Sequence, residues 1–177
     1  LKPDQIAQLG VARTFQSIRL YEKQSVLENV MMGRQIHTKT RTLGVLLRDR
    51  RTRAEEQQIR EDSFQMLQRM ELEQYAQVTA DSLPYAAQRR LEIARALATN
   101  PFLLLLDEPA AGMNRKETEE LDELLVELRK EFQLTILLIE HDMRLVMKIS
   151  DRVIVLDHGR KIAEGPPQEI RQHPEVI

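Results

Sequence analysis

Two adjacent carboxylates, Asp107 and Glu108, follow the apolar run 102–106 and precede a proline. A short apolar run that ends at a breaker residue is typical of a strand buried on both faces of a parallel sheet. The carboxyl end of such a strand is where open α/β sheets bind their ligands. We therefore expect Asp107 to hold a metal ion and Glu108 to polarise a water molecule. For this segment alone, a buried strand ending in a solvated acidic turn is the alternative.

A glutamine and a histidine follow two other expected strands. Gln16 follows the candidate strand at 11–15, and His141 follows the apolar strand at 134–139. Because the carboxyl ends of parallel strands meet at one edge of a sheet, we expect both side chains to approach the two carboxylates. Taken singly, Gln16 can be explained as a surface turn residue, and a strand-end cap is the better explanation for His141. Their order along the chain favours a common site.

Phosphoryl transfer is the chemistry that suits these four side chains. A metal-bound phosphate at this edge would contact Gln16 and Asp107. Its terminal phosphoryl group would then lie within reach of Glu108 and His141. The reaction requires mainly positioning and charge compensation, which such a set of side chains supplies around a metal ion.

The elements that must position these residues alternate between strands and helices. This alternation predicts an α/β fold, in which crossover helices cover a parallel sheet. Asn114, with Glu117 three residues later, has the pattern of a capping box that begins a helix with leucines at core spacing. The apolar run 153–156 and the returning segment 161–163 flank a turn signal and predict a hairpin.

The composition narrows the classes of function. The chain has 177 residues and a net charge of −2, so it is not a general polyanion binder. Six basic residues against one acid lie between Lys39 and Arg53, but no aromatic residue interleaves with them. A solvated surface segment therefore explains this stretch better than a nucleic-acid site. The chain has no cysteine, which excludes disulfides and thiolate metal sites, and it has no apolar run long enough to span a bilayer.

The order of these segments resembles that of the nucleotide-binding subunit of an ATP-binding cassette (ABC) transporter, and in particular the branched-chain amino acid uptake group. The matching segments are a Q-loop at 13–16, the helix after the signature motif at 91–97, Walker B with its D-loop at 105–114, and a switch-histidine segment at 139–143. The resemblance implies the carboxyl-terminal part of a P-loop NTPase-type parallel sheet with a helical subdomain. Residues 1–25 and 100–177 would form part of the ATPase core, and 26–99 the helical subdomain.

The resemblance also implies a role for each candidate residue. Gln16 would touch the metal or the attacking water and relay the nucleotide state to the membrane subunit. Asp107 would hold Mg²⁺, and Glu108 would be the general base. His141 would contact the γ-phosphate of ATP, and Asn114 stands where many relatives carry the D-loop aspartate.

The signature motif departs from its usual form, Leu-Ser-Gly-Gly-Gln. The matching residues are Leu83, Pro84, Tyr85, Ala86 and Ala87, followed by Gln88. Pro84 lacks both the serine hydroxyl and a main-chain N–H, and as a first helical residue it would favour extending the helix backwards. Ala86 places a methyl group where glycine lets the main chain approach phosphate closely. We hypothesise that this segment binds phosphate more weakly than the usual motif.

No Gly-x-x-x-x-Gly-Lys-Ser/Thr sequence, the Walker A phosphate loop, occurs in the chain. In the family this loop lies upstream of Gln16, so we expect it before Leu1 in a longer parent protein. The chain would then lack the main-chain cradle and the lysine that hold the β-phosphate. We expect it to bind ATP poorly by itself.

The resemblance implies that the parent is a transport-coupled ATPase that uses ATP and Mg²⁺. It would be the energy-coupling subunit of a branched-chain amino acid importer, peripheral to the cytoplasmic face of the membrane. Its partners would be a second nucleotide-binding subunit, identical or not, and permease subunits, without nucleic acid. Two alternatives remain open: an ATPase subunit of a lipopolysaccharide-type exporter, and a truncated or non-hydrolysing interaction module that lacks the P-loop.

Overall fold

The computed structural model describes residues 2–37 and 50–176. The chain forms two compact units, Leu1–Leu138 and Ile139–Ile177, and each is described by itself. Most of the basic stretch between Lys39 and Arg53 lies outside the described residues.

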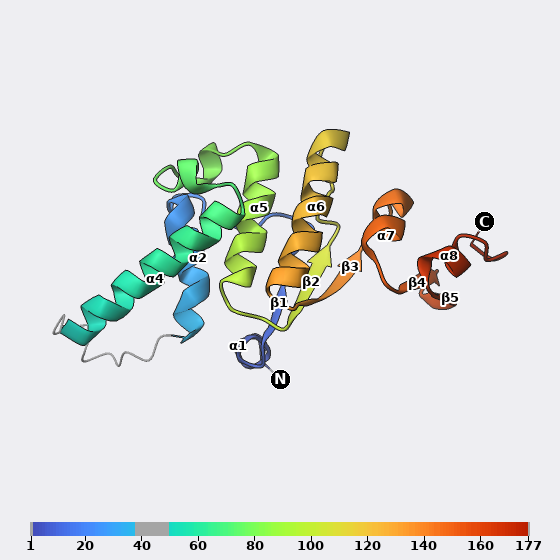
Figure 1. The fold of residues 1–177 in the computed structure, drawn as a ribbon, viewed down its shortest axis with the longest axis horizontal. Helices are drawn as coiled ribbons and strands as arrows, with labels where there is room; N and C mark the ends of the chain where they lie inside the picture. Colours follow the sequence, from blue (N-terminus) through green and yellow to red (C-terminus); the bar gives the residue numbers. More distant parts are fainter. Residues whose placement is uncertain (1, 38–49, 177) are drawn as a thin grey trace. The chain divides into compact units, whose positions relative to one another are not determined.

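The first unit is built around a three-stranded sheet with the strand order β1-β2-β3 (Figure 1). Strands β1 and β2 run parallel, with Val11 opposite Leu103 and Arg13 opposite Leu105. The residues that follow these two strands therefore emerge at the same edge of the sheet, as the sequence predicts. The strands are β1 (Val11–Arg13), β2 (Leu103–Asp107) and β3 (Thr135–Ile139).

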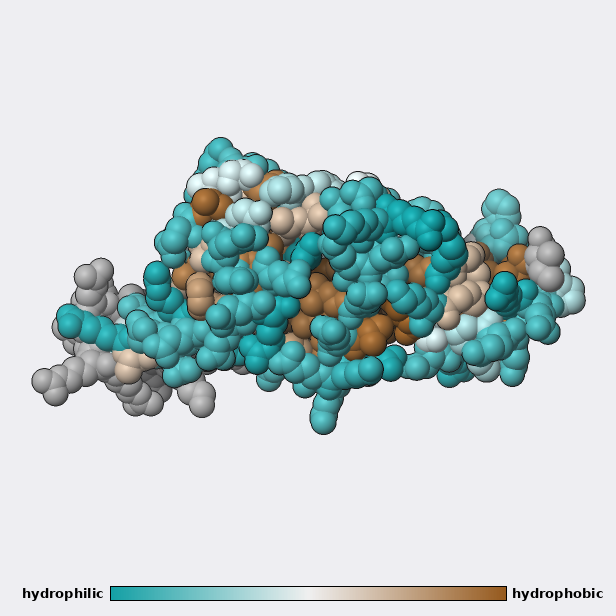
Figure 2. Space-filling model, turned by 45° about the horizontal axis from the view of Figure 1, so that its top comes forward, coloured by the Kyte–Doolittle hydropathy of each residue, from teal (hydrophilic) through white to brown (hydrophobic). Residues whose placement is uncertain are grey.

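One face of this sheet is buried and the other is open among the described residues. On the buried face, Leu104 and Leu106 of β2 are almost inaccessible to solvent, whereas Leu103 and Leu105 between them are only half-buried. Leu137 of β3 is 53% exposed, and Figure 2 shows apolar surface that no other side chain covers. For the described residues, the expectation that the strand before Asp107 is buried on both faces is therefore wrong, because Leu103 and Leu105 are only half-buried.

Helices make up the segment between β1 and β2. Ser25 and Glu28 form a reciprocal capping box at the start of α2, which explains why that helix begins where it does. Helix α2 packs closely on α5, since a methyl group at Gly33 would overlap the main-chain oxygen of Arg95. The elements are α2 (Val26–Arg34), η1 (Gln35–His37), α4 (Arg50–Arg69), η2 (Glu73–Tyr75), η3 (Ala80–Ser82) and α5 (Tyr85–Leu97).

Two more helices complete the first unit, α1 (Pro3–Gln8) and α6 (Arg115–Glu131). The capping box predicted at the start of α6 is confirmed. Asn114 Oδ1 accepts a hydrogen bond from the Glu117 N–H at 3.0 Å, and the Glu117 carboxylate accepts one from the Asn114 N–H at 2.9 Å. Leu121, Leu125 and Leu128 of this helix are buried as their spacing predicts, and Leu124 is half-buried.

The second unit holds a helix followed by a hairpin. Its core consists of Val153, Ala163 and Ile170. The predicted hairpin is confirmed, because β4 and β5 pair antiparallel around a turn in which Gly159 has a φ of 78°. The elements are α7 (Met143–Ile149), β4 (Val153–Asp157), β5 (Arg160–Gly165) and α8 (Pro167–Ile170). Among the described residues, no helix is both long and apolar enough to cross a membrane.

Candidate functional site

The ends of β1 and β2 bring two of the predicted residues into direct contact. The Gln16 amide nitrogen Nε2 donates a hydrogen bond of 2.9 Å to Glu108 Oε2. Beside it, the Arg13 guanidinium pairs with Asp107 Oδ2 at 3.1 Å. The parallel pairing of the strands thus places an amide, two carboxylates and a guanidinium at one edge of the sheet.

Glu108 has a left-handed main chain, with a φ of 45°. This conformation costs a residue with a side chain on the order of 1–2 kcal/mol. It turns the chain sharply after β2, and the Ala111 N–H donates to the Glu108 carbonyl at 3.1 Å to close the turn. Strain of this kind is concentrated at functional sites, where the surrounding structure holds it in place.

The oxygen atoms at this edge suit Mg²⁺ with phosphate and water as its remaining ligands. Magnesium commonly takes one or two carboxylates and fills its other positions with water and phosphate oxygens. Among residues 2–37 and 50–176, no group of three or more His, Cys, Asp or Glu side chains forms an all-protein metal site. Asp107 and Gln16 can each offer one oxygen, so the donor set fits a nucleotide-bound ion. Arg13 competes with such an ion for Asp107.

A buried arginine, which the sequence reasoning missed, binds the main chain of the segment around Gln16. Arg89 of α5 is fully buried, and its guanidinium donates to the carbonyl oxygens of Phe15 and Gln16, both at 2.7 Å. Glu92, also buried, pairs with Arg89 at 2.8 Å. The available signal was the i, i+3 spacing of these opposite charges in line with the apolar residues of the helix.

The segment that matches the signature motif forms the start of α5. Pro84 is the N-cap, not the first helical residue, so the helix is not extended backwards by it. Ala86 is only 7% exposed, while Gln88 Nε2 donates to the Leu83 carbonyl at 2.9 Å. Because no side chain caps this end, the first N–H groups of α5 form the kind of helix N-terminus that attracts an anion.

The segment 110–114 that matches the D-loop lies against the start of α5. Gly112 has a φ of 79°, and a methyl group there would lie 3.2 Å from Cε1 of Tyr85. The Tyr85 ring therefore packs against this turn in the same chain. Asn114 uses its side chain to cap α6, a role that aspartate performs equally well.

His141 lies in the second unit, at the turn before α7. Its side chain is 76% exposed, and its Nδ1 lies 3.9 Å from Glu140 Oε2. Asp142 caps α7 by accepting the Arg144 N–H at 2.9 Å, and this hydrogen bond lowers the pKa of the Asp142 carboxyl. The approach of His141 to the other three site residues stays a prediction.

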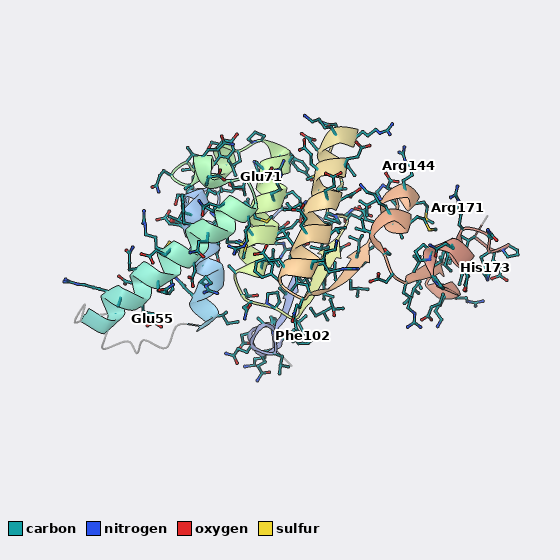
Figure 3. All side chains as sticks on the ribbon, viewed as in Figure 1. Glu55, Glu71, Phe102, Arg144, Arg171 and His173 are labelled. Atoms are coloured by element: carbon teal, nitrogen blue, oxygen red, sulfur yellow. The ribbon has the colours of Figure 1, made fainter. Side chains whose placement is uncertain are left out.

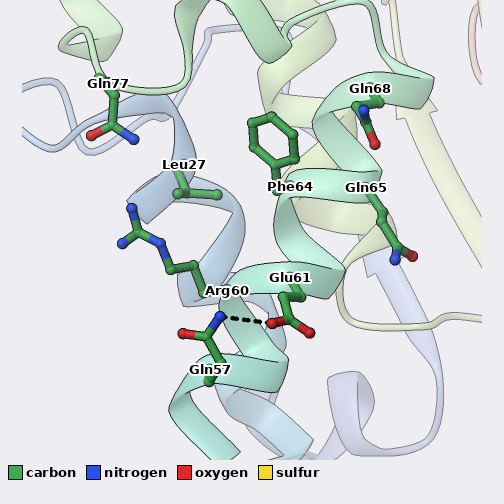
Figure 4. A pocket seen from close by; sticks show the side chains of 8 residues that line it. All are labelled: Leu27, Gln57, Arg60, Glu61, Phe64, Gln65, Gln68 and Gln77. Atoms are coloured by element: carbon green, nitrogen blue, oxygen red, sulfur yellow. Dashed lines mark hydrogen bonds between the residues drawn. The ribbon is translucent and has the colours of Figure 1, made fainter.

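A separate groove lies between α2 and α4 (Figure 4). It encloses about 490 Å³ and shares no residue with the edge at Gln16 and Glu108. Phe64 and four glutamines give it a mixed apolar and amide surface. The lining residues are Leu27, Gln57, Arg60, Glu61, Phe64, Gln65, Gln68 and Gln77.

Known proteins share this sequence and fold. The family model "ABC transporter" matches residues 2–111, and the model "Branched-chain amino acid ATP-binding cassette transporter" matches residues 160–177. The chain is 48% identical to the high-affinity branched-chain amino acid transport ATP-binding protein LivG of Salmonella typhimurium, covering 100% of this chain and 69% of LivG. It is 44% identical to BraF of Pseudomonas aeruginosa, covering 97% of this chain and 68% of BraF.

Solved structures agree with these sequence relatives. The ADP conformation of MJ1267, an ATP-binding cassette of an ABC transporter, superposes with a TM-score of 0.79 at 29% identity. That match covers 99% of this chain and 70% of MJ1267. The structure of cbiO1 from Clostridium perfringens, part of the transporter complex cbiONQ, gives a TM-score of 0.77 at 29% identity, covering 96% and 62% of the two chains.

Proposed function

The chain belongs to the ABC transporter family, and from that premise we propose that it is the ATP-binding, ATP-hydrolysing energy-coupling part of an importer for branched-chain amino acids. The observation that carries the proposal is the contact between Gln16 and Glu108 at the edge of the sheet. The cargo is inferred from the names of LivG and BraF, which match nearly the whole chain.

Glu108 is the residue that we assign to proton transfer. Its carboxylate accepts the Gln16 amide at 2.9 Å, and a carboxylate can accept the proton of an attacking water. The left-handed main chain of Glu108 directs the carboxylate toward the Q-loop. Gln16 holds that carboxylate in place and orients the water, so the two residues act as one unit.

Asp107 and Gln16 are the residues that we assign to Mg²⁺. When bound, the ion neutralises charge on the transferring phosphoryl group and its neighbour. Arg13 pairs with Asp107 in this structure and so holds in place the carboxylate that would bind the ion. His141 is assigned to the γ-phosphate.

The start of α5 is the surface that we assign to a second nucleotide-binding subunit. Its N–H groups lack a side-chain cap and would bind phosphate of ATP held by that subunit. Ala86 is only 7% exposed, and we keep the hypothesis that it contacts phosphate more weakly than glycine would. Permease subunits would place the assembly at the cytoplasmic face of a membrane.

The test is a calorimetric titration with Mg²⁺-ATP of two proteins, the chain itself and a chimera with the part of LivG that the chain does not span. Both carry Glu108→Gln to prevent turnover. Because the chain contains no Walker A sequence, we expect binding only in the chimera, and ATP hydrolysis when Glu108 is restored. Failure of both proteins to bind would support the non-hydrolysing interaction module instead.

The cargo is tested separately from the ATPase activity. The chimera is combined with the permease subunits of the LivG system, and ATP-dependent leucine uptake into vesicles is measured. We expect uptake that Glu108→Gln abolishes. ATP hydrolysis without uptake would favour the exporter ATPase over the importer subunit.

A further inference from the structure

We propose that Arg89 is a positioning residue that fastens Gln16 to helix α5, so that the Gln16–Glu108 pair and the signature segment move as one body. This inference rests on the proposed function, which assigns the roles of Gln16, Glu108 and the signature segment. Neither the sequence pattern nor the names of the relatives assign any role to Arg89.

The first observation is a buried charge that binds main chain. The Arg89 side chain has an exposure of 0%, and its two terminal nitrogens donate to the consecutive carbonyls of Phe15 and Gln16, each at 2.7 Å. Hydrogen bonds from a charged donor in a buried position are strong and directional. Among the described residues, the Arg89 Nε has no hydrogen-bond partner, so the terminal nitrogens make the bonds that fix the position of the guanidinium.

The second observation is that neighbouring turns of α5 hold the other end of the same segment. Glu92 pairs with Arg89 at 2.8 Å and also accepts the Arg19 N–H at 3.3 Å. The Arg95 guanidinium donates to the Arg19 carbonyl. Three charged side chains of one helix thus bind the main chain at Phe15, Gln16 and Arg19. These bonds set the path of the main chain independently of the side chains that it carries.

The third observation extends the connection to the D-loop segment. The Arg89 Nη2 lies 3.5 Å from the Tyr85 hydroxyl, and the Tyr85 ring packs against Gly112. Arg89 therefore lies between the Q-loop, the start of α5 and the turn at 110–114. A displacement of Gln16 would move the guanidinium and, with it, the first turn of the helix.

Arginine is the side chain that this geometry requires. Its planar group presents two nitrogens to two carbonyl oxygens at once, whereas lysine is a single ammonium that can reach one of them well. Lysine would keep the charge that neutralises Glu92 but would lose one of the two main-chain bonds. Arg89→Lys is therefore a variant that weakens the connection without leaving Glu92 unpaired.

Hydrogen exchange of the main chain tests the connection on this chain without nucleotide. We expect Arg89→Gln to accelerate exchange about tenfold in peptides covering 14–20 and 110–114, and Arg89→Lys to accelerate it less. Peptides from α4 should not change. The matched control is Arg90→Gln, because Arg90 is the next residue of the helix but pairs outward with Glu71 and Glu120; Glu71 is labelled in Figure 3.

Two outcomes of the exchange experiment would overturn the proposal. One is that peptides covering 14–20 exchange at the same rate in the Arg89 variants as in Arg90→Gln. The other is a uniform acceleration over the whole chain, which would indicate loss of folding without a local connection. If Arg89→Gln does not fold, the comparison of Arg89→Lys with Arg90→Gln tests the proposal.

A double-mutant cycle in the chimera tests whether Arg89 affects ATP hydrolysis through Gln16. We expect Arg89→Lys to lower kcat several-fold while KM for ATP stays within about twofold. In a background of Gln16→Ala, Arg89→Lys should add little further loss, because it acts through Gln16. Additive losses would overturn the positioning role. A wild-type chimera without ATPase activity would overturn the proposed function. The rate of hydrogen exchange at 14–20 would then test the connection between Arg89 and Gln16 without a measurement of activity.

Discussion

The Gln16 amide donates a 2.9 Å hydrogen bond to the Glu108 carboxylate across 92 positions of sequence. The pairing of β1 with β2 brings the two residues to one edge, and the left-handed turn at Glu108 completes the approach. The contact joins a segment that α5 holds by its main chain to the carboxylate that we assign to proton transfer.

Gln16→Glu is predicted to destabilise the chain in a pH-dependent way. Two carboxylates at this distance repel when both are ionised, and one of them then binds a proton more tightly, so its pKa rises. We expect a loss on the order of 1 kcal/mol at about pH 8 that shrinks near pH 4, where one carboxyl is protonated. Urea unfolding at both pH values measures it. Gln16→Met is the control and should show a loss independent of pH; the same independence in Gln16→Glu would contradict the contact.

Gly33→Ala is predicted to destabilise the packing of α2 on α5. The added methyl group would overlap the Arg95 carbonyl oxygen, which belongs to a helix main chain and cannot rotate away. Overpacking of this kind costs about 1–3 kcal/mol. The measurement is the midpoint of urea unfolding. The control is Ala98→Gly, which removes the side chain that Gly33 faces. In the double variant with Gly33→Ala, it should not restore stability, because the clash with the main chain remains.

Asn114→Ala is predicted to cost about 1 kcal/mol of unfolding free energy, because the Glu117 N–H loses its acceptor at the start of α6. Asn114→Asp should retain that stability, and its charge should add a few tenths of a kcal/mol through the helix dipole. Thermal unfolding of the three proteins measures the difference. Equal destabilisation by both substitutions would show that the cap does not stabilise α6.

Glu28 is predicted to stabilise the chain at neutral pH but not in acid. Hydrogen bonds from the Ser25 N–H and hydroxyl lower the pKa of the Glu28 carboxyl. Because the folded-state pKa lies below the unfolded one, this stabilisation is complete above the ordinary pKa of glutamate. It is lost as the pH falls through the lowered value. Glu28→Gln should therefore lower stability at pH 7, with a penalty that vanishes in acid. A penalty that stays constant across this range would exclude the carboxylate as its source.

The features that local signals encode could be predicted from the sequence. Helix α7 covers Met143–Ile149, where an aspartate cap and a short apolar repeat define it locally. The capping box at Asn114 and the hairpin around Gly159 follow from residues that are neighbours in the chain. The order of motifs likewise indicated the family, since it is a property of the sequence and needs no contact between segments.

The environments of Arg89, Glu108 and strand β2 could not be predicted from the sequence, because contacts between distant segments create them. Arg89 has the sequence appearance of a surface residue, and it is buried because two carbonyls and Glu92 satisfy its charge. The left-handed conformation of Glu108 is unfavourable locally and persists only because the flanking turn and the Gln16 contact hold it. Strand β2 buries Leu104 and Leu106 and leaves Leu103 and Leu105 half-buried, an asymmetry that its run of leucines does not specify. In each case a long-range contact outweighs the local preference of the residue.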